Sequence, residues 1–199
     1  MLRPPGALGR GLLMLNHTNS FVRGIIEWVI LLAIAFGVSL FIRTYVASPY
    51  VVPTGSMENT IEVGDQVFAQ KVTLELGQGV KAGDIVVFKN PDGTSSHDLL
   101  VKRVIAVGGQ TVDLKDGRVY VDGQPLTEPY TIGTSAPLAT QQPGVQVSFP
   151  YKVPEGSVWM MGDNRENSAD SRYFGAVPNE NLVAVVMIRF WPLNRLGTL

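Results

Sequence analysis

The sequence has no cysteine and only two histidines, His17 and His97. Without cysteine, disulfides, thiolate nucleophiles and cysteine-ligated metals are excluded. Charge is also sparse and balanced, because 16 Lys and Arg stand against 17 Asp and Glu for a net charge of -1. A chain with no basic stripe and no recognition motif is a poor nucleic-acid binder. We therefore expect no cofactor, no metal and no nucleic-acid partner.

The sequence does contain one long apolar run, Gly24–Ile42. As a helix it would be roughly 28 Å long, close to the hydrocarbon thickness of a bilayer. Trp28 and Tyr45 suit the two membrane interfaces, and Glu27 lies one turn from the start, where it can reach headgroup water. The run is long for a cleaved signal peptide, and Tyr45-Val46-Ala47 is a poor cleavage site. These features predict an uncleaved signal anchor.

The basic residues around this run predict its orientation. Arg3, Arg10 and Arg23 precede it, whereas no basic residue follows Arg43 until Lys71. By the positive-inside rule, the N-terminus is expected in the cytoplasm of a single-pass plasma-membrane protein. The expected organisation is a short cytoplasmic segment (1–23), a transmembrane anchor (24–42) and a β-rich domain on the outer side of the membrane (43–199).

The outer domain shows the alternation and turn residues of strands, with little sustained helical periodicity. Lys115-Asp116-Gly117 between two apolar segments predicts a tight hairpin. A segment rich in Pro, Thr, Ser and Gln suggests a small inserted lobe or hairpin at about 122–155. The fold expected is a mostly antiparallel β domain. Its expected strands are Gln66–Val72, Asp84–Lys89, Leu99–Val107, Thr111–Leu114, Arg118–Asp122, Ser157–Met161 and Leu182–Arg189.

Pro53-Thr54-Gly55-Ser56-Met57 follows an extended apolar segment just beyond the anchor. Pro53 restricts the backbone before the turn, and Gly55 allows a sharp bend, so the Ser56 hydroxyl could be held out from a rigid edge. Such a serine is a candidate nucleophile. Taken alone, the same pattern is more typical of an ordinary turn.

Two groups could activate Ser56 from the same side of the membrane. His97 lies in the polar loop 93–98, and His17 would be on the opposite side. Lys102 interrupts the apolar strand Leu99–Val107, where burial would lower its pKa and let a neutral amine act as a general base. The alternative is that Lys102 protects an edge strand from aggregation. Arg103, on the other strand face, is expected to be solvated.

A third polar cluster, Gly162–Arg172, follows the strand Ser157–Met161. Its alternating aspartates and arginines offer charge-assisted pairs that would stiffen a loop. The three motifs together, Pro-Thr-Gly-Ser-Met, Lys-Arg-Val-Ile-Ala-Val-Gly-Gly and Gly-Asp-Asn-Arg-Glu-Asn-Ser-Ala-Asp-Ser-Arg, resemble bacterial type I signal peptidase (leader peptidase). The resemblance covers roughly residues 22–191. Asn59 and Glu166 stand where many members carry proline and aspartate.

The resemblance implies a membrane-bound serine endopeptidase that removes signal peptides from exported preproteins after small residues of the Ala-x-Ala type. It also implies an antiparallel sheet or barrel-like catalytic domain with a reduced accessory lobe. The implied roles are Ser56 as nucleophile, Lys102 as general base, Thr54 with the Ser56 N–H as oxyanion hole, and Ser168 as the residue orienting the lysine. Implied structural support comes from Asp163, Arg165, Asp170 and Arg172, and implied substrate contacts from Val52, Pro53, Ile61, Leu100 and Val101.

The expected partners are preprotein signal peptides and the lipid bilayer, and the sequence leaves the oligomeric state open. Two other functions remain to be weighed. A self-cleaving repressor-like protease would share the serine and lysine, but the anchor and the lack of a DNA-binding module argue against it. A membrane-tethered β-rich binding or assembly module without catalysis would have no need of Ser56 or Lys102.

Overall fold

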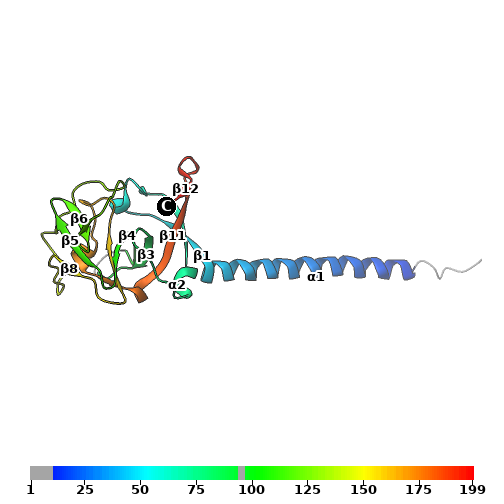
Figure 1. Cartoon of the computed structure of the whole chain (residues 1–199). Coiled ribbons are helices and arrows are strands. Elements are labelled where there is room, and N and C mark those ends of the chain that lie inside the picture. Colours follow the sequence, from blue (N-terminus) through cyan, green and yellow to red (C-terminus); the bar gives the residue numbers. More distant parts are fainter. Residues whose placement is uncertain (1–10, 94–96) are drawn as a thin grey trace, which may run out of the picture. The chain divides into compact units, whose positions relative to one another are not determined.

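A computed structural model describes residues 11–93 and 97–199, with only the backbone described in residues 11–20. Two compact units result, divided after Thr44. The first contains the helix α1 (Gly11–Phe41), drawn as a single long coil in Figure 1. Its segment Phe21–Val46 is long and apolar enough to cross a membrane, and its most apolar part is not buried in the structure. Arg3 and Arg10, on which the predicted orientation depends, lie outside the described residues.

Glu27, expected as an interfacial acid, lies one helical turn from Arg23. The Arg23 Nε and the Glu27 Oε1 are 3.4 Å apart, and both side chains are exposed. A pair at this spacing partly offsets the cost of placing either charge near the membrane boundary. The charged end of the apolar segment is therefore compatible with a position at headgroup depth.

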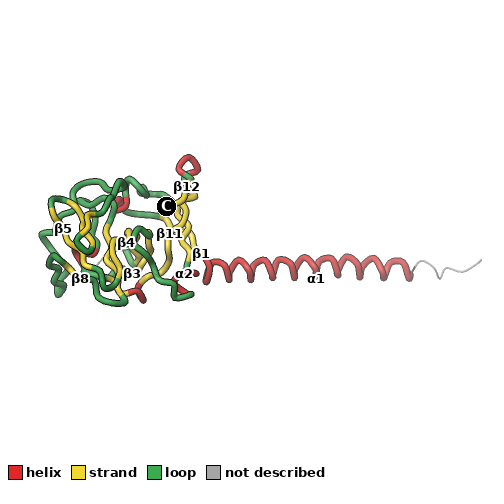
Figure 2. Tube along the Cα trace, in the orientation of Figure 1, coloured by secondary structure: helices red, strands yellow, loops and turns green. Residues whose placement is uncertain are grey.

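The second unit, residues 45–199, is built mainly on an eight-stranded antiparallel sheet, visible as the yellow arrangement in Figure 2. The strand order is β1-β2-β11-β3-β4-β9-β10, and β12 pairs with β11. In the part of the chain that the structure describes, β1 and β10 do not pair, so the sheet stays open. The expected mostly antiparallel β fold is confirmed, in the form of an open sheet and not of a closed barrel. Its strands are β1 (Ala47–Val51), β2 (Gln66–Gln70), β3 (Ile85–Lys89), β4 (Leu99–Val107), β9 (Ser157–Met161), β10 (Val177–Pro178), β11 (Leu182–Trp191) and β12 (Gly197–Thr198).

A second, four-stranded antiparallel sheet forms the small lobe. Its strands are β5 (Thr111–Lys115), β6 (Arg118–Val121), β7 (Gln124–Pro125) and β8 (Tyr151–Lys152), in the order β7-β6-β5-β8. The lobe sheet therefore begins before the segment 122–155 that the sequence suggested. The reason is that β8 returns to pair with β5, which places the predicted hairpin inside the lobe.

The hairpin itself is as predicted. Lys115 pairs with Arg118, and the two residues between them, Asp116 and Gly117, both have positive φ, 51° and 72°. This is the backbone that a two-residue turn needs to match the twist of its strands, and Asp-Gly adopts it readily.

The short helices are α2 (Val72–Glu75) and α3 (Ser171–Phe174). The core lies against the sheets, and its largest fully buried apolar side chains include Phe88, Trp159 and Met57. Trp159 contacts Tyr151 and Phe149 from the lobe, with ring centroids 4.6 and 5.7 Å away. Because aromatic burial contributes strongly to stability, this contact fixes the lobe against β9.

Candidate active site

Ser56 lies in a short 3₁₀ turn, Gly55–Met57, that follows β1. Thr54 before the turn is extended, with φ −128° and ψ 153°. Met57 is fully buried in the core beside Val52, and this packing holds the turn in place. Ser56 is 7% exposed, so its hydroxyl lies at the edge of the core and not in bulk solvent.

Lys102 lies in β4, one of the central strands, and its amine meets the serine. The Lys102 Nζ donates hydrogen bonds to the Ser56 Oγ at 2.6 Å and to the Val101 carbonyl at 3.0 Å. Burial lowers the pKa of the Lys102 ammonium from 10.5 to about 8, against the opposing effect of Asp170 and Asp163. A lysine on an exposed edge strand would keep its hydration, so the edge-protection alternative does not fit this position.

Arg103, expected to be solvated, is buried instead. Its guanidinium forms two hydrogen bonds to the fully buried Asp163, 2.9 and 2.6 Å long, and stacks 3.9 Å from the ring centroid of Tyr130. Both faces of β4 are covered from Lys102 to Ala106. A nearly continuous apolar run is typical of a strand buried on both faces, and that signal in Leu99–Val107 could have predicted the burial of Arg103.

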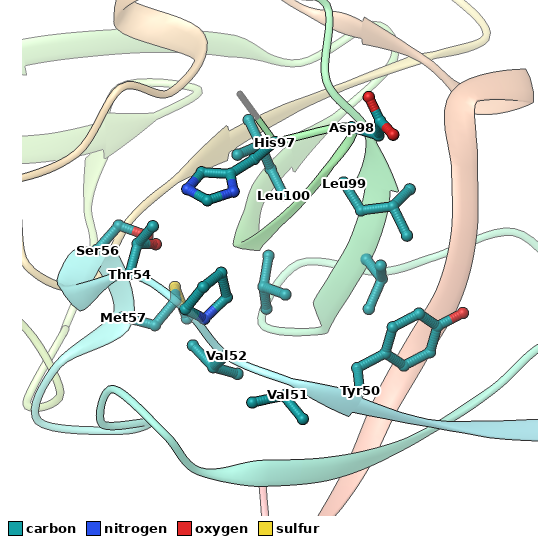
Figure 3. A pocket seen from close by; sticks show the side chains of 13 residues that line it. Tyr50, Val51, Val52, Thr54, Ser56, Met57, His97, Asp98, Leu99 and Leu100 are labelled. Carbon is teal, nitrogen blue, oxygen red and sulfur yellow. The ribbon is translucent and has the colours of Figure 1, made fainter. Parts of the chain in front are cut away.

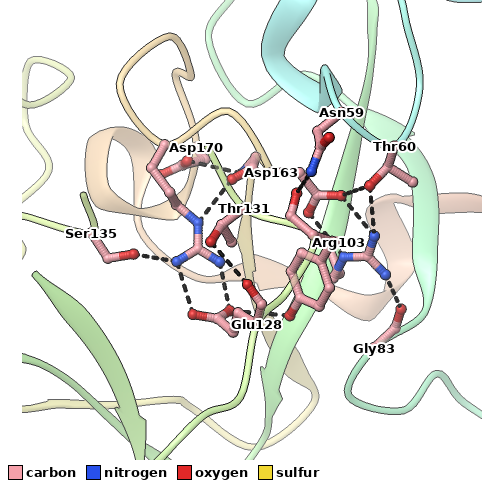
Figure 4. Close-up of polar contacts among 12 residues, drawn as sticks. Asn59, Thr60, Gly83, Arg103, Glu128, Thr131, Ser135, Asp163 and Asp170 are labelled. Atoms are coloured by element: carbon pink, nitrogen blue, oxygen red, sulfur yellow. Dashed lines mark hydrogen bonds and ion pairs between the residues drawn. The ribbon is translucent and has the colours of Figure 1, made fainter. Parts of the chain in front are cut away.

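The aspartates and arginines of the 162–172 loop do not all pair with each other. Asp170 and Arg172 do, through two contacts of 2.9 Å, whereas Asp163 pairs with Arg103. The fully buried Arg165 reaches the lobe residue Glu128, at 2.6 and 3.1 Å. Figure 4 shows Arg103, Asp163, Asp170 and Glu128 among the polar contacts of this region. Sequence reasoning missed Glu128, because no local pattern links it to a loop so far along the chain.

Ser168 was expected to hold the lysine. Among the residues that the structure describes, its buried Oγ has no hydrogen-bond partner, so the expected bond to Lys102 is not formed. The hydroxyl nevertheless lies beside the nucleophile turn. A Cβ placed on Gly162 would collide with the Ser168 Oγ and come within 2.5 Å of the Ser56 carbonyl oxygen. Gly162 thus lets the loop that carries Ser168 approach the nucleophile closely.

A cavity of about 260 Å³ opens beside Ser56, as Figure 3 shows. Two chain segments form most of its walls. One runs from the end of β1 through the turn that carries Ser56, and the other covers the residues before β4 and the start of β4. The lining residues are Tyr50, Val51, Val52, Pro53, Thr54, Ser56, Met57, Val87, His97, Asp98, Leu99, Leu100 and Val101. Ile61, expected among the substrate contacts, is fully buried in the core and does not line the cavity.

Both departures from the family pattern have local reasons in the structure. Asn59 has φ 80°, which a proline ring cannot adopt, and its side-chain amide donates to the Tyr130 carbonyl at 3.0 Å. The Glu166 carboxylate accepts from the Thr134 N–H and hydroxyl, at 3.1 and 3.2 Å. Both residues therefore connect the catalytic sheet to the lobe segment that carries Glu128.

Within the part of the chain that the structure describes, no group of three or more His, Asp or Glu could hold a metal ion. The polar chemistry beside the cavity is that of Ser56, Lys102, Thr54 and His97. A serine in contact with a dehydrated amine can attack a carbonyl carbon when the amine takes its proton. The arrangement is suited to acyl transfer.

Comparison with known proteins gives a consistent result. Residues 25–191 match the family described as signal peptidase, peptidase S26. The chain is 39% identical to a probable signal peptidase I-1 of Synechocystis over 87% of this chain and 86% of that protein. It is 34% identical to a signal peptidase I of Bacillus licheniformis over 91% and 94%. A solved signal peptidase I from Enterococcus faecalis is 31% identical, with a TM-score of 0.43, and covers 53% of this chain and 95% of its own.

The burial of Lys102 predicts a stability cost that depends on pH. Because its folded-state pKa of about 8 is below the ordinary 10.5, protonation opposes folding at pH values below 8. This cost disappears as the pH rises from 8 to 10.5. Lys102→Met should therefore raise the free energy of unfolding at pH 7 by up to about 3 kcal/mol and remove that pH dependence. Denaturant unfolding of the detergent-solubilised chain at pH 7 and pH 10 measures both effects.

The exposed Lys152 provides the control for this substitution. Lys152→Met should change neither the stability nor its dependence on pH by more than about 0.5 kcal/mol. Loss of stability in Lys102→Met at pH 7, to the same extent as at pH 10, would contradict the assigned cost of the buried ammonium.

The Asp170–Arg172 pair predicts a large structural effect. Asp170 also accepts hydrogen bonds from the Gly162 and Arg172 backbone N–H groups, at 3.0 and 3.1 Å. Asp170→Ala leaves a buried guanidinium unpaired and should lower the free energy of unfolding by about 3–5 kcal/mol. Breaking the Lys115–Asp113 pair, in which the lysine is exposed to solvent, with Lys115→Ala should cost much less than the loss of the buried pair. Equal costs in parallel denaturant titrations would refute this assignment.

Proposed function

The chain belongs to the signal peptidase family, peptidase S26, and from this membership we propose that it cleaves signal peptides from exported preproteins with a Ser56–Lys102 dyad. The observation that carries the proposal is the 2.6 Å contact between the Lys102 Nζ and the Ser56 Oγ. A general base must be within hydrogen-bond reach of the proton it takes, and this pair meets that requirement.

In the proposed mechanism, neutral Lys102 accepts the Ser56 proton while the Ser56 Oγ attacks the scissile carbonyl carbon. The carbonyl oxygen becomes an oxyanion, which the Ser56 N–H and the Thr54 hydroxyl stabilise. When the tetrahedral species collapses, the Lys102 ammonium gives its proton to the departing amine. A water molecule then attacks the acyl-serine ester, Lys102 takes a proton from this water, and the ammonium returns it to Ser56.

Ser168, Asp163, Arg165, Asp170 and Arg172 have supporting roles in this proposal. The three charged pairs hold the loop beside the nucleophile, and the buried Ser168 hydroxyl is free to accept a hydrogen bond from Lys102 once the amine carries the Ser56 proton. Such a bond would compensate the Lys102 ammonium at the stage when the amine is charged.

The cavity beside Ser56 supports the proposed binding of apolar side chains. Val52, Pro53, Leu100 and Val101 form apolar walls, and a volume of about 260 Å³ has room for the alanine side chains that the proposal places there. An extended substrate would add to the exposed backbone edges of the two wall segments and alternate its side chains between them. Every second side chain would then enter the cavity, which is the spacing of the two small residues in the proposed Ala-x-Ala preference.

Tethering to the plasma membrane completes the proposal. The helix segment Phe21–Val46 serves as a single-pass anchor, with the N-terminus in the cytoplasm and the peptidase unit on the outer side. A signal peptide held in the same bilayer would present its cleavage site at that surface. The tether raises the effective concentration of enzyme and substrate, which soluble encounter would not provide.

Cleavage of a purified preprotein by the full chain in lipid vesicles tests the dyad. Ser56→Ala and Lys102→Ala should each lower kcat by at least about a thousandfold, because both act on one proton transfer. Lys102→Arg should be equally inactive, since a guanidinium stays protonated. Mass spectrometry of the products should locate the cut after a small residue.

The control variant Lys152→Ala, changed at an exposed position, should cleave the preprotein at the wild-type rate. Full activity of Lys102→Ala would refute the proposed base. Absence of cleavage by the wild-type protein, with specific binding of the preprotein retained, would instead favour a non-catalytic binding module.

The pH dependence of cleavage tests the protonation state. Since only neutral Lys102 can accept the Ser56 proton and its pKa is about 8, kcat/KM should rise about tenfold per pH unit below pH 8 and level off above it. A rate profile from pH 6 to 10 measures this. Loss of cleavage in His97→Ala, with cleavage retained in Lys102→Ala, would instead identify His97 as the base.

A further inference from the structure

The peptide group between Gly55 and Ser56 carries one hydrogen-bond donor and one acceptor, which have different roles here. Its N–H belongs to Ser56 and is the backbone donor of the proposed oxyanion hole, and its C=O belongs to Gly55. Because the peptide bond is planar, a partner that fixes the carbonyl also fixes the direction of the N–H. The question is therefore which residues hold the Gly55 carbonyl.

Two donors hold it. The Glu58 backbone N–H donates to the Gly55 carbonyl at 3.2 Å as part of the 3₁₀ turn. The Asn164 side-chain Nδ2 donates to the same oxygen at 3.3 Å. The Asn164 backbone N–H also donates to the Ser56 carbonyl at 3.1 Å. One residue of the 162–172 loop thus contacts the peptide groups on both sides of the nucleophile.

The Glu58 side chain sets the orientation of the Asn164 amide. The Asn164 Nδ2 donates to the Glu58 Oε2 at 2.9 Å. An ionised carboxylate can only accept hydrogen bonds, so it selects the amide rotamer that turns the NH₂ group toward Glu58 and Gly55. A charged acceptor also forms a stronger bond than a neutral one, which limits rotation of the amide.

Gly55 leaves room for this carboxylate. A Cβ built at Gly55 would lie 2.5 Å from the Glu58 Oε1 and 2.7 Å from its carboxyl carbon. The Gly55 backbone is not among the positive-φ positions, so alanine would be accepted there without backbone strain. Its methyl group would instead push the flexible end of Glu58 away from Asn164.

From these contacts we propose that Asn164, oriented by Glu58, is a positioning residue for the oxyanion hole. It holds the Gly55–Ser56 peptide group so that the Ser56 N–H points at the developing oxyanion. The hydrogen bond to the carbonyl also polarises the peptide and makes its N–H a better donor. The inference rests on the proposed function, because it assigns a means of alignment to the same nucleophile. The residues that produce this alignment are Gly55, Glu58 and Asn164.

The test is preprotein cleavage by the full chain in lipid vesicles. Asn164→Ala should lower kcat by about tenfold to a hundredfold with little change in KM, because the aligned N–H matters mainly in the transition state. Glu58→Ala and Gly55→Ala should each lower kcat by about fivefold, the usual effect of one lost hydrogen bond. Glu58→Gln keeps an acceptor and should stay within about twofold of the wild type.

A transition-state analogue separates alignment from general damage. A peptide boronic acid ending in an alanine analogue forms a tetrahedral adduct with Ser56 and places an oxygen in the oxyanion hole. Asn164→Ala should weaken its binding by the same factor as kcat, while binding of an uncleavable substrate peptide stays unchanged. The double variant Glu58→Ala with Asn164→Ala should be no slower than Asn164→Ala alone, since Glu58 acts through Asn164.

Matched controls come from Asn179 and Glu180, which are both exposed. Asn179→Ala and Glu180→Ala should leave kcat, KM and boronate affinity unchanged. If Asn164→Ala does not fold, Glu58→Ala and Gly55→Ala carry the same test. Equal losses of boronate and substrate-peptide affinity would overturn the inference, as would an increased kcat in Glu58→Ala, which would mean that the carboxylate acts by its charge on the oxyanion.

Different results would refute the Ser56–Lys102 dyad and the positioning role of Asn164. Persistent cleavage by Ser56→Ala, or no boronate adduct on the wild-type protein, would refute the dyad itself. An inactive Ser56→Ala together with unchanged kcat and boronate affinity in Asn164→Ala would leave the dyad intact and refute only the positioning role.

Discussion

The contact between the Lys102 Nζ and the Ser56 Oγ depends on keeping water away from the amine. In water this nitrogen would be protonated at neutral pH and could accept nothing. Burial in β4, with both faces of the strand covered, brings its pKa to about 8. The sheet therefore does more than hold two side chains at a fixed distance. The packing on both faces of β4 around Lys102 lowers the pKa of the amine, and a lysine needs this lower pKa to act as a base.

Three buried ion pairs hold the 162–172 loop beside Ser56. They differ in how far apart in the sequence the two partners lie. Arg103–Asp163 joins β4 to the 162–172 loop, Arg165–Glu128 joins that loop to the lobe, and Asp170–Arg172 closes the loop on itself. The segment around Ile132 adds backbone bonds to Asp163 and Arg165 on the same loop, at 2.8 and 2.9 Å. The lobe does not line the cavity, yet it holds the loop that contacts the peptide groups on both sides of Ser56.

Much of this could be predicted from the sequence where the signal was local. The apolar, β-branched runs Leu99–Val107 and Ser157–Met161 predicted strands with the observed ends, and Asp116-Gly117 predicted the hairpin. The partners of Arg165 and Arg103 could not be predicted, since ionic pairing across distant segments depends on which loops the sheet order brings together. The burial of Arg103 could have been predicted from the length of the apolar run Leu99–Val107. The choice between an open sheet and a barrel could not be made from the sequence, because closure depends on pairing between the two outermost strands.

The carboxylates near Lys102 have opposing effects on the site. Asp170 and Asp163 both raise the pKa of the lysine, while burial lowers it, with burial the larger influence. Removing these aspartates would make the amine easier to deprotonate, yet it would leave Arg103 and Arg172 buried without partners. Each aspartate therefore holds the loop through its arginine while it raises the pKa of the nearby amine. Burial has to outweigh both carboxylates to bring the pKa of Lys102 to about 8, so the order of the polar loop and the dehydration of the lysine are needed together.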